Sequence, residues 1–108
     1  MASTGTSQLT GNDPVKVDAK HYTVELENEK VRVLRIRYGP HEKSVMHSHP
    51  ALIGVMMTDG QIRFTYPDGK VEDVTVTAGQ VLSFPAIDHL PENLSDHAFE
   101  VIAVELKS

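Results

Sequence analysis

The sequence predicts an all-β domain whose short strands close into a sandwich or barrel. From Val15 onward, runs of β-branched and aromatic residues alternate with turn-forming residues, and no apolar pattern of helical period lasts for a dozen residues. Eight or nine strands at this spacing are typical of a closed sheet, because closure removes the unpaired edges that promote aggregation. A chain of 108 residues is enough for one hydrophobic core, and no second domain is expected.

The single domain is expected over residues 13–108. Residues 1–12 are rich in Ser, Thr and Gly and contain almost no apolar side chain that a core could bury. We therefore expect them to form a disordered leader with no part in function.

The first four strands are expected as two hairpins, 22–26 with 31–38 and 52–58 with 61–66. A short polar link, Glu27-Asn28-Glu29-Lys30, joins the first pair. The second pair flanks Asp59-Gly60, and the tolerance of these residues for positive φ suits a two-residue type I′ turn.

Three further strands follow. Pro67-Asp68-Gly69 makes a tight turn into residues 71–76, where valines alternate with polar residues, so that one face is buried. Ala78-Gly79 separates this strand from residues 81–84. The final run, 99–106, is apolar enough to be buried on both faces, so it closes the sheet or meets a partner subunit.

The arrangement of apolar residues along strand 31–38 also predicts a homodimer. Val33 and Leu34 are adjacent and therefore point to opposite faces of strand 31–38, which suggests that both faces are covered. A second copy of the chain packed against this strand and the last one would supply the cover.

Composition narrows the classes of function. The net charge is -5 and there is no basic cluster, so nucleic acid is not an expected partner. No apolar run approaches the roughly 20 residues that cross a bilayer, and the N-terminus lacks the features of a signal peptide, which predicts a cytoplasmic protein. Because the chain has no cysteine, any metal must be held by imidazole or oxygen.

His47 and His49 are the first candidates for metal ligands. Residues two apart on a strand project to the same face, so both imidazoles can approach one ion at about 2.0–2.1 Å. Pro50 restricts His49 to extended backbone, which favours a strand there. His89, which follows Phe84-Pro85, is the expected third ligand on a strand paired beside the first.

Two motifs around these histidines resemble those of the cupin superfamily. The first cupin motif is Gly, five residues, His-x-His, three or four residues, Glu, six residues and Gly. Here His41 stands at the first Gly, His47 and His49 at the histidines, Ile53 at the Glu and Gly60 at the last Gly. The chain thus lacks the acidic ligand of the motif.

The second cupin motif is Gly, five residues, Pro-x-Gly, two residues, His, three residues and Asn. Gly79, Pro85, His89 and Asn93 match it, while Ile87 replaces the inner Gly and the following gap is one residue short. The resemblance implies a double-stranded β-helix, the cupin or jelly-roll barrel. Three stretches, including 46–50 and 67–70, are similar to small stand-alone cupins labelled β-alanine degradation proteins.

The resemblance implies a neutral three-histidine centre, as in the three-histidine iron dioxygenases among the cupins. Fe(II) is the favoured ion, with Mn, Zn or Ni as alternatives, and two or three coordination positions would stay open. The opposing interpretation is three histidines with no metal, each needing another hydrogen-bond partner in the interior.

Other residues near the motifs carry two interpretations each. Ile53, Val55 and Met57 share one face of their strand and form either a substrate pocket or plain core. His41 is a candidate proton shuttle, although a solvent-facing position is its default, as it is for His21 and His97. Asn93 is expected near the metal ligands or as an anchor of its loop.

Three functions are compatible with these expectations. The first is a metal-dependent enzyme of dioxygenase type acting on a small molecule. The second is a non-catalytic cupin that binds or senses a small ligand. The third is a metal-dependent isomerase, which needs a base, for which His41 or Glu42 would be the candidates.

Overall fold

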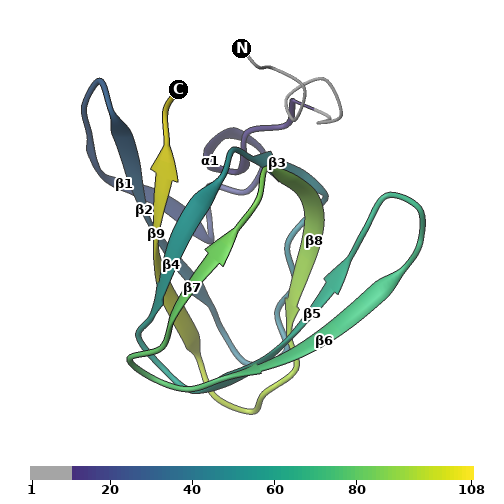
Figure 1. Ribbon diagram of the computed structural model, residues 1–108. Coiled ribbons are helices and arrows are strands. Elements are labelled where there is room, and N and C mark those ends of the chain that lie inside the picture. The colour runs from purple at the N-terminus through teal and green to yellow at the C-terminus, as the bar shows by residue number, and fades with distance from the viewer. Residues whose placement is uncertain (1–10) are drawn as a thin grey trace.

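The fold is all-β, as the sequence predicts. The computed structural model describes residues 11–108, so most of the expected leader, 1–12, lies outside the described residues. The elements in chain order (Figure 1) are α1 (Pro14–Val17), β1 (Tyr22–Glu27), β2 (Val31–Tyr38), β3 (His47–His49), β4 (Leu52–Met56), β5 (Gly60–Thr65), β6 (Val71–Val76), β7 (Val81–Phe84), β8 (Ile87–Asn93) and β9 (Phe99–Leu106).

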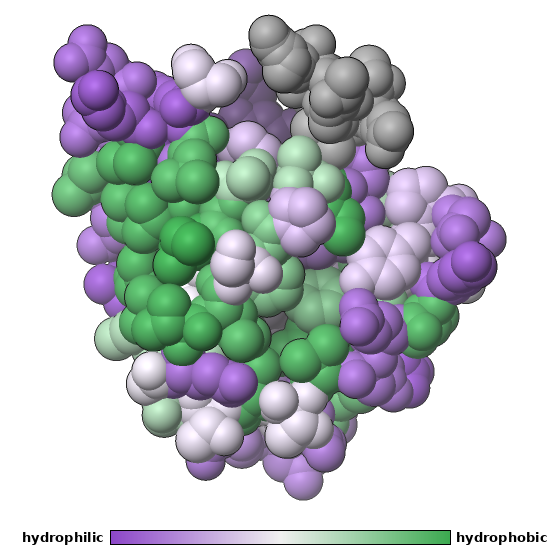
Figure 2. All heavy atoms as spheres, viewed as in Figure 1, coloured by the Kyte–Doolittle hydropathy of each residue, from purple (hydrophilic) through white to green (hydrophobic). Residues whose placement is uncertain are grey.

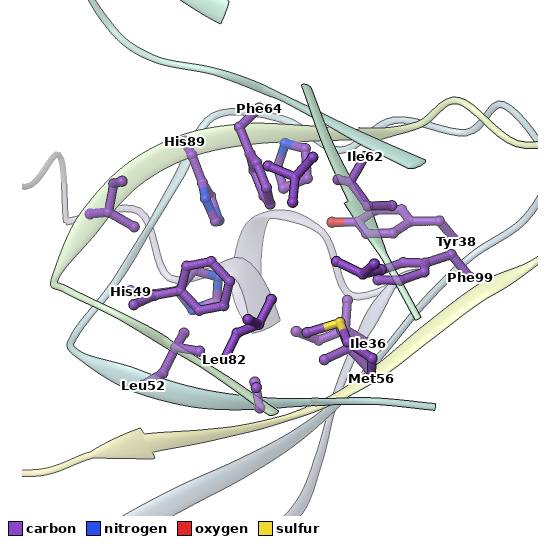
Figure 3. Close-up of a pocket in the computed structure, with 18 of the residues that line it drawn as sticks. Ile36, Tyr38, His49, Leu52, Met56, Ile62, Phe64, Leu82, His89 and Phe99 are labelled. Carbon is purple, nitrogen blue, oxygen red and sulfur yellow. The ribbon is translucent and has the colours of Figure 1, made fainter. Parts of the chain in front are cut away.

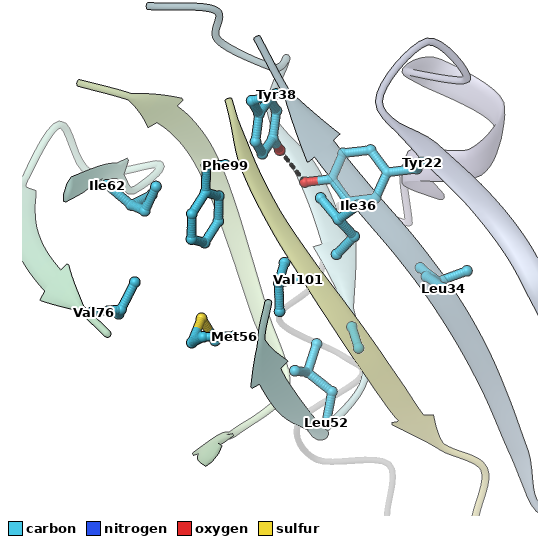
Figure 4. Packing of buried hydrophobic residues seen from close by; sticks show 11 residues of the cluster. Tyr22, Leu34, Ile36, Tyr38, Leu52, Met56, Ile62, Val76, Phe99 and Val101 are labelled. Atoms are coloured by element: carbon cyan, nitrogen blue, oxygen red, sulfur yellow. Dashed lines mark hydrogen bonds between the residues drawn. The ribbon is translucent and has the colours of Figure 1, made fainter. Parts of the chain in front are cut away.

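The strands form two antiparallel sheets that enclose one core. The larger sheet has the order β1-β2-β9-β4-β7 and the smaller one β3-β8-β5-β6. Inward side chains of both sheets meet between them; Figure 4 shows Ile62 and Val76 of the smaller sheet facing Met56, Phe99 and Val101 of the larger. The sequence predicts no helix, but α1 makes a single turn, in which the Asp13 side chain caps the backbone N–H of Val15.

Two of the expected turns are confirmed. β1 and β2 pair as a hairpin, and the Asn28 side chain accepts hydrogen bonds from the backbone N–H groups of Lys30 and Val31 in the link between them. β5 and β6 form the second true hairpin. Gly69 sits in its turn at φ 88°, a conformation that glycine adopts without strain.

The hairpin expected at Asp59-Gly60 is wrong. β4 pairs with β7 and β9, whereas β5 pairs with β6 and β8, so these two residues carry the chain from one sheet to the other. The Asp59 carboxylate accepts a hydrogen bond from the backbone N–H of Ala78 instead of serving a tight turn. A local turn signal cannot distinguish a hairpin from a crossover, because strand partners are chosen by long-range burial.

Gly60 is required by close packing. A Cβ atom at this position would lie 2.5 Å from Cδ1 of the buried Phe99 ring. Gly60→Ala is therefore expected to lower the free energy of unfolding by about 1–3 kcal/mol, the usual cost of overpacking a core. In the matched control Gly54→Ala, the nearest atom is the flexible Met56 methyl at 3.1 Å, so the loss is expected to be smaller. Urea unfolding measures both, and equal stability of the two variants would contradict the prediction.

Part of the outward face of the larger sheet is apolar, beside a charged part that carries Arg35, Arg37 and Glu100. β9 lies in the middle of this sheet, with Val101 and Ala103 buried on its inward face and Ile102 and Val104 half-buried on its outward face. Figure 2 shows hydrophobic residues gathered on the side of the molecule that carries β4 and β7. We call the outer apolar face the set Leu26, Val31, Val33, Ile53, Val55, Val81, Ile102, Val104 and Leu106.

Candidate metal centre

Strands β3 and β8 bring the three predicted histidines together. His47 is paired directly opposite His89, and His49 lies two residues along β3 on the same face. One nitrogen from each ring lies within 4.8 Å of the other two. His47 and His49 are buried, at 0% and 2% exposure, and Figure 3 shows His49 and His89 pointing into one cavity. The pairing of β8 beside β3, which the sequence suggested, produces this cluster.

Hydrogen bonds determine which nitrogens of His47 and His49 face the centre. Nδ1 of His47 lies 2.8 Å from the carbonyl oxygen of Val45, and Nδ1 of His49 lies 2.6 Å from a carboxylate oxygen of Glu105. Both oxygens only accept, so in the neutral rings each Nδ1 carries the proton and each Nε2 has a free lone pair. These two Nε2 atoms are 3.1 Å apart. Two lone pairs at that distance repel unless a proton or a cation lies between them.

His89 completes the cluster with an unsatisfied nitrogen. Its Nε2 is buried and has no hydrogen-bond partner among the described residues. The ring lies 4.9 Å from that of His47 and 5.1 Å from that of His49, centre to centre. Burial, then the neighbouring His49 and His47, lower the pKa of His89 well below its usual value. The lowered pKa values keep His47 and His89 neutral at pH 7, and three imidazole rings this close together fit a divalent transition metal.

The metal-free protein is expected to lose stability as the pH falls from 6.5 to about 4. Burial and the nearby His49 lower the pKa of His47 from 6.5 to about 4. Between these values the unfolded chain binds a proton that the folded chain does not, so stability rises with pH. The full effect is about 3 kcal/mol for His47. Urea unfolding of chelator-treated protein at pH 7, 5.5 and 4 measures it, and a pH-independent free energy over this window would contradict it.

A chain of charged side chains, of which Glu105 is buried and Arg32 and Asp13 are half-buried, supports His49 on the side away from the cluster. Glu105, at 2% exposure, accepts from His49 through Oε2 and from Nε of Arg32 through Oε1, at 2.7 Å. Arg32 in turn makes two hydrogen bonds to Asp13, at 2.9 and 3.0 Å. Burial alone would raise the pKa of Glu105, but the hydrogen bonds from His49 and Arg32 outweigh it and lower the pKa. Glu105 is therefore ionised at neutral pH and keeps the proton of His49 on Nδ1.

Sequence reasoning missed Glu105 and Arg32, although a signal was present. Phe99, Val101 and Ala103 alternate as the inward face of β9, and Glu105 continues the same parity. Arg32 likewise shares the inward face of β2 with Leu34. A charged residue in phase with the buried face of an apolar strand predicts a buried ion pair or a functional site.

Two tyrosines approach the cluster on the side of His47. The Tyr22 hydroxyl lies 3.1 Å from Nε2 of His47, and it is also hydrogen-bonded to the hydroxyl of Tyr38 (Figure 4). Both rings are 2% exposed, and burial raises the pKa of both phenols above the usual value. Sequence reasoning missed both tyrosines, and no local pattern marks them.

The cavity beside the histidines is about 70 Å³ and mostly apolar. From β4 it is lined by Leu52, Gly54 and Met56. The prediction that Ile53, Val55 and Met57 line it is wrong. Leu52, Gly54 and Met56 are the buried positions of β4, so Ile53 and Val55 lie on the outer apolar face and Met57 is 48% exposed.

The same parity corrects the motif alignment. The cupin motif allows three or four residues between the histidine pair and its Glu, and four residues after His49 lead to Gly54. Because Gly54 is buried and lines the cavity, it occupies the inward position that Ile53 was expected to hold. The acidic ligand of the motif is absent with either spacing.

His41 lies outside the site. It is exposed, has a φ of 59°, bonds Asp96 at 2.7 Å through Nε2, and does not line the cavity. His97 is exposed, as expected. The solvent-facing position expected for His21 is wrong: the residue is 7% exposed, with Nδ1 against Asp18 and Nε2 3.0 Å from Glu42.

Asn93 anchors a loop, and among the described residues none of its side-chain hydrogen bonds goes to a metal ligand. Its side-chain amide donates to the carbonyl oxygens of Gly39 and His97 and accepts from the backbone N–H of Ser95. Of the two roles expected for Asn93, these bonds fit the loop anchor. The contacts that hold Nδ1 of the ligands His47 and His49 come from the Val45 carbonyl and Glu105.

Comparisons with known proteins agree with this geometry. Residues 34–105 match the family described as Cupin domain. A cupin domain protein of Bordetella pertussis is 29% identical, with a TM-score of 0.75, over 81% of this chain and 92% of that one. No curated protein matches. The comparisons lend no support to the narrower likeness to β-alanine degradation proteins.

Two further solved structures share the fold at 20% identity. A conserved protein with a double-stranded β-helix domain from Klebsiella pneumoniae has a TM-score of 0.64, over 79% of this chain and 74% of that one. A cupin family protein from Methanocaldococcus jannaschii has a TM-score of 0.62, over 82% and 83%. Within residues 11–108, no helix is long and apolar enough to cross a membrane.

Proposed function

Because the chain belongs to the cupin domain family, we propose that it is a metal-binding cupin whose ion is held by His47, His49 and His89. One observation carries the proposal. One nitrogen of each imidazole lies within 4.8 Å of the other two, the Nε2 atoms of His47 and His49 are 3.1 Å apart, and Nε2 of His89 has no hydrogen-bond partner among the described residues. A divalent cation bound here removes the repulsion between the Nε2 lone pairs of His47 and His49, and it also gives the buried Nε2 of His89 a partner.

We propose an enzyme of dioxygenase type, with Fe(II) as the favoured ion and Mn, Zn or Ni as alternatives. When bound, iron would supply Lewis acidity and activate dioxygen. The chain's own contribution is to keep His49 and His47 in the correct tautomers, through Glu105 and the Val45 carbonyl, and to exclude bulk water with the apolar cavity wall.

The alternative proposal is a cupin that binds a small ligand without turning it over. Its support is the lining of the cavity, which among the residues that the structure describes contains no carboxylate and no lysine that could serve as a general base. An isomerase has less support, because His41 does not line the cavity. Hydrogen bonds from Lys20, the Gly39 backbone and His21 lower the pKa of Glu42 to about 2, which makes it a weak base.

Metal analysis followed by oxygen uptake tests the enzyme proposal. Protein purified without a polyhistidine tag should contain about one transition metal ion per chain at saturation. The iron-loaded form is then assayed for oxygen consumption against diketones, thiols and small acids. Uptake with one class supports the dioxygenase. Saturable binding that raises the melting temperature with no product from any metal form would replace it with the binding module.

We propose a homodimer through the outer apolar face. The residues of the outer apolar face carry no charge, although Arg35, Arg37 and Glu100 border it on the same side of the sheet, so the apolar patches of two copies can pack about a twofold axis. Ile53 and Val104 are paired across β4 and β9 near its centre. A second copy would cover this sheet as the sequence suggested. The cytoplasmic location stays a prediction.

Ile53→Asp is expected to convert the dimer to a monomer, because it buries a carboxylate at the interface of both copies. Sedimentation velocity at about 10–100 μM covers the affinity range of ordinary dimers. Val71→Asp is the control, since Val71 is 53% exposed on the β5–β6 hairpin and outside the outer apolar face. A monomeric wild type, or a dimer that survives Ile53→Asp, would refute this interface.

A further inference from the structure

The cavity has a polar end and an apolar body. Among the described residues that line it, four side chains carry a nitrogen or oxygen, Tyr22, Tyr38, His49 and His89, and none of these lining residues is an acid, lysine or arginine. In Figure 3 the two labelled histidines lie together, and the hydroxyl of Tyr38 is on the side of its ring that faces them. Leu52, Leu82 and Met56 form part of the remaining wall.

The order of protons in the tyrosine pair follows from the tautomer of His47. Since Nδ1 of His47 donates to the Val45 carbonyl, its Nε2 can only accept, and the Tyr22 hydroxyl must be the donor across their 3.1 Å contact. Tyr22 has then used its proton, so Tyr38 must donate in the hydrogen bond between the two hydroxyls. The chain of donors runs from Tyr38 to Tyr22 to His47.

An ion bound at the centre uses the Nε2 lone pair of His47, the same lone pair to which the Tyr22 hydroxyl donates. The Tyr22 hydroxyl then has a donor with no acceptor on His47, in a cavity whose other walls are apolar. Such a donor costs free energy unless it finds a new acceptor. A ligand held in an open position at the histidines would supply that acceptor, in competition with the hydroxyl oxygen of Ser44, which also interacts with Tyr22.

We propose that Tyr22 donates the hydrogen bond that selects an oxygen-bearing ligand at the metal, that Tyr38 orients Tyr22, and that this ligand is a small molecule with oxygen at one end and an apolar body. The inference rests on the proposed metal site. Tyr22 lies on β1, before the matched family residues 34–105, so the feature belongs to this chain's N-terminal hairpin.

The apolar wall sets the class of ligand. A sugar or a polyol would bury hydroxyl groups against leucine, phenylalanine and methionine side chains without hydrogen-bond partners, which is costly. A short-chain acid, ketone or enol places its oxygen at the polar end and its hydrocarbon in the cavity. The structure thus favours compact molecules with no polar group at the far end.

Cobalt(II)-loaded protein and azide test the role of Tyr22. Tyr22→Phe is expected to bind cobalt within about twofold of wild type but to bind azide about tenfold more weakly, as judged by visible absorption, because one hydrogen bond to an anion is lost. Tyr66→Phe is the matched control, since Tyr66 bonds Glu72 outside the cavity and should bind azide as wild type does. Butanoate should also bind about tenfold more tightly than its isostere 3-hydroxypropanoate.

The outcomes separate the two proposals. If the wild type binds no cobalt, the metal site fails and the role of Tyr22 falls with it. If cobalt binds and Tyr22→Phe holds azide as tightly as wild type, the role of Tyr22 is refuted and the metal site stands. A large loss of cobalt affinity in Tyr22→Phe would show that Tyr22 binds the metal itself. This result also refutes its proposed role as a hydrogen-bond donor to the bound ligand. Should this variant not fold, the infrared band of azide on the wild type must shift between H₂O and D₂O; an unshifted band refutes the donor.

Discussion

His47→Ala is expected to abolish stoichiometric binding of a divalent metal. The variant removes one of three imidazoles, and the two that remain, His49 and His89, offer only two ligands in a buried site. Loss of a supporting residue behind a ligand costs about 10–100-fold in affinity, so loss of the ligand itself should cost more than a hundredfold. Elemental analysis of untagged protein and calorimetric titration with zinc or cobalt measure the change.

The matched control for this prediction is His97→Ala. His97 is exposed, and its Nδ1 is hydrogen-bonded to the carbonyl of the adjacent Ala98, away from the metal ligands. It should therefore keep one metal ion per chain with unchanged affinity. A His47→Ala protein that retains stoichiometric metal would refute the assignment of the centre, and equal losses in both variants would point to a general effect of histidine number.

Glu105→Gln is expected to damage both stability and metal binding. Gln has the shape of Glu but carries an NH₂ group in place of one acceptor oxygen. Either His49 or Arg32, which both donate to Glu105, would then meet a second donor instead of an acceptor. Breaking a buried charged pair costs about 3–5 kcal/mol, and we expect a value at the low end because Arg32 keeps its two bonds to Asp13. Each kcal/mol lowers the melting temperature by about 4–8 °C in a domain of this size.

The metal affinity of Glu105→Gln should fall about 10–100-fold, because His49 no longer has a carboxylate that keeps its proton on Nδ1. Glu100→Gln is the control on the same strand. Glu100 lies on the outward face of β9 against Arg35 and Arg37, where exposed ion pairs are worth about 1 kcal/mol or less. Equal stability and affinity in the two variants would show that the Glu105 contact has no role in holding His49.

The sequence by itself determined the elements and the candidate ligands. Its alternation of apolar and polar residues within each run predicts most strands to within two residues, because side-chain direction within a strand depends only on position along it. The same local rule places His47 and His49 on one face. The order of the two motifs added His89, and the structure pairs it directly with His47.

Only the tertiary structure decided which strands pair, which face of β4 is inward and what lies behind the ligands. Asp59-Gly60 has the residues of a hairpin turn, yet it links two sheets, because burial of the whole core outweighs one turn preference. The short connection after His49 changes which alternate residues face the core, so Leu52 points inward and Ile53 outward. Glu105 is 56 residues from His49 along the chain, and Tyr22 is 25 from His47. Contacts at such separations exist only once both sheets have closed around the cavity.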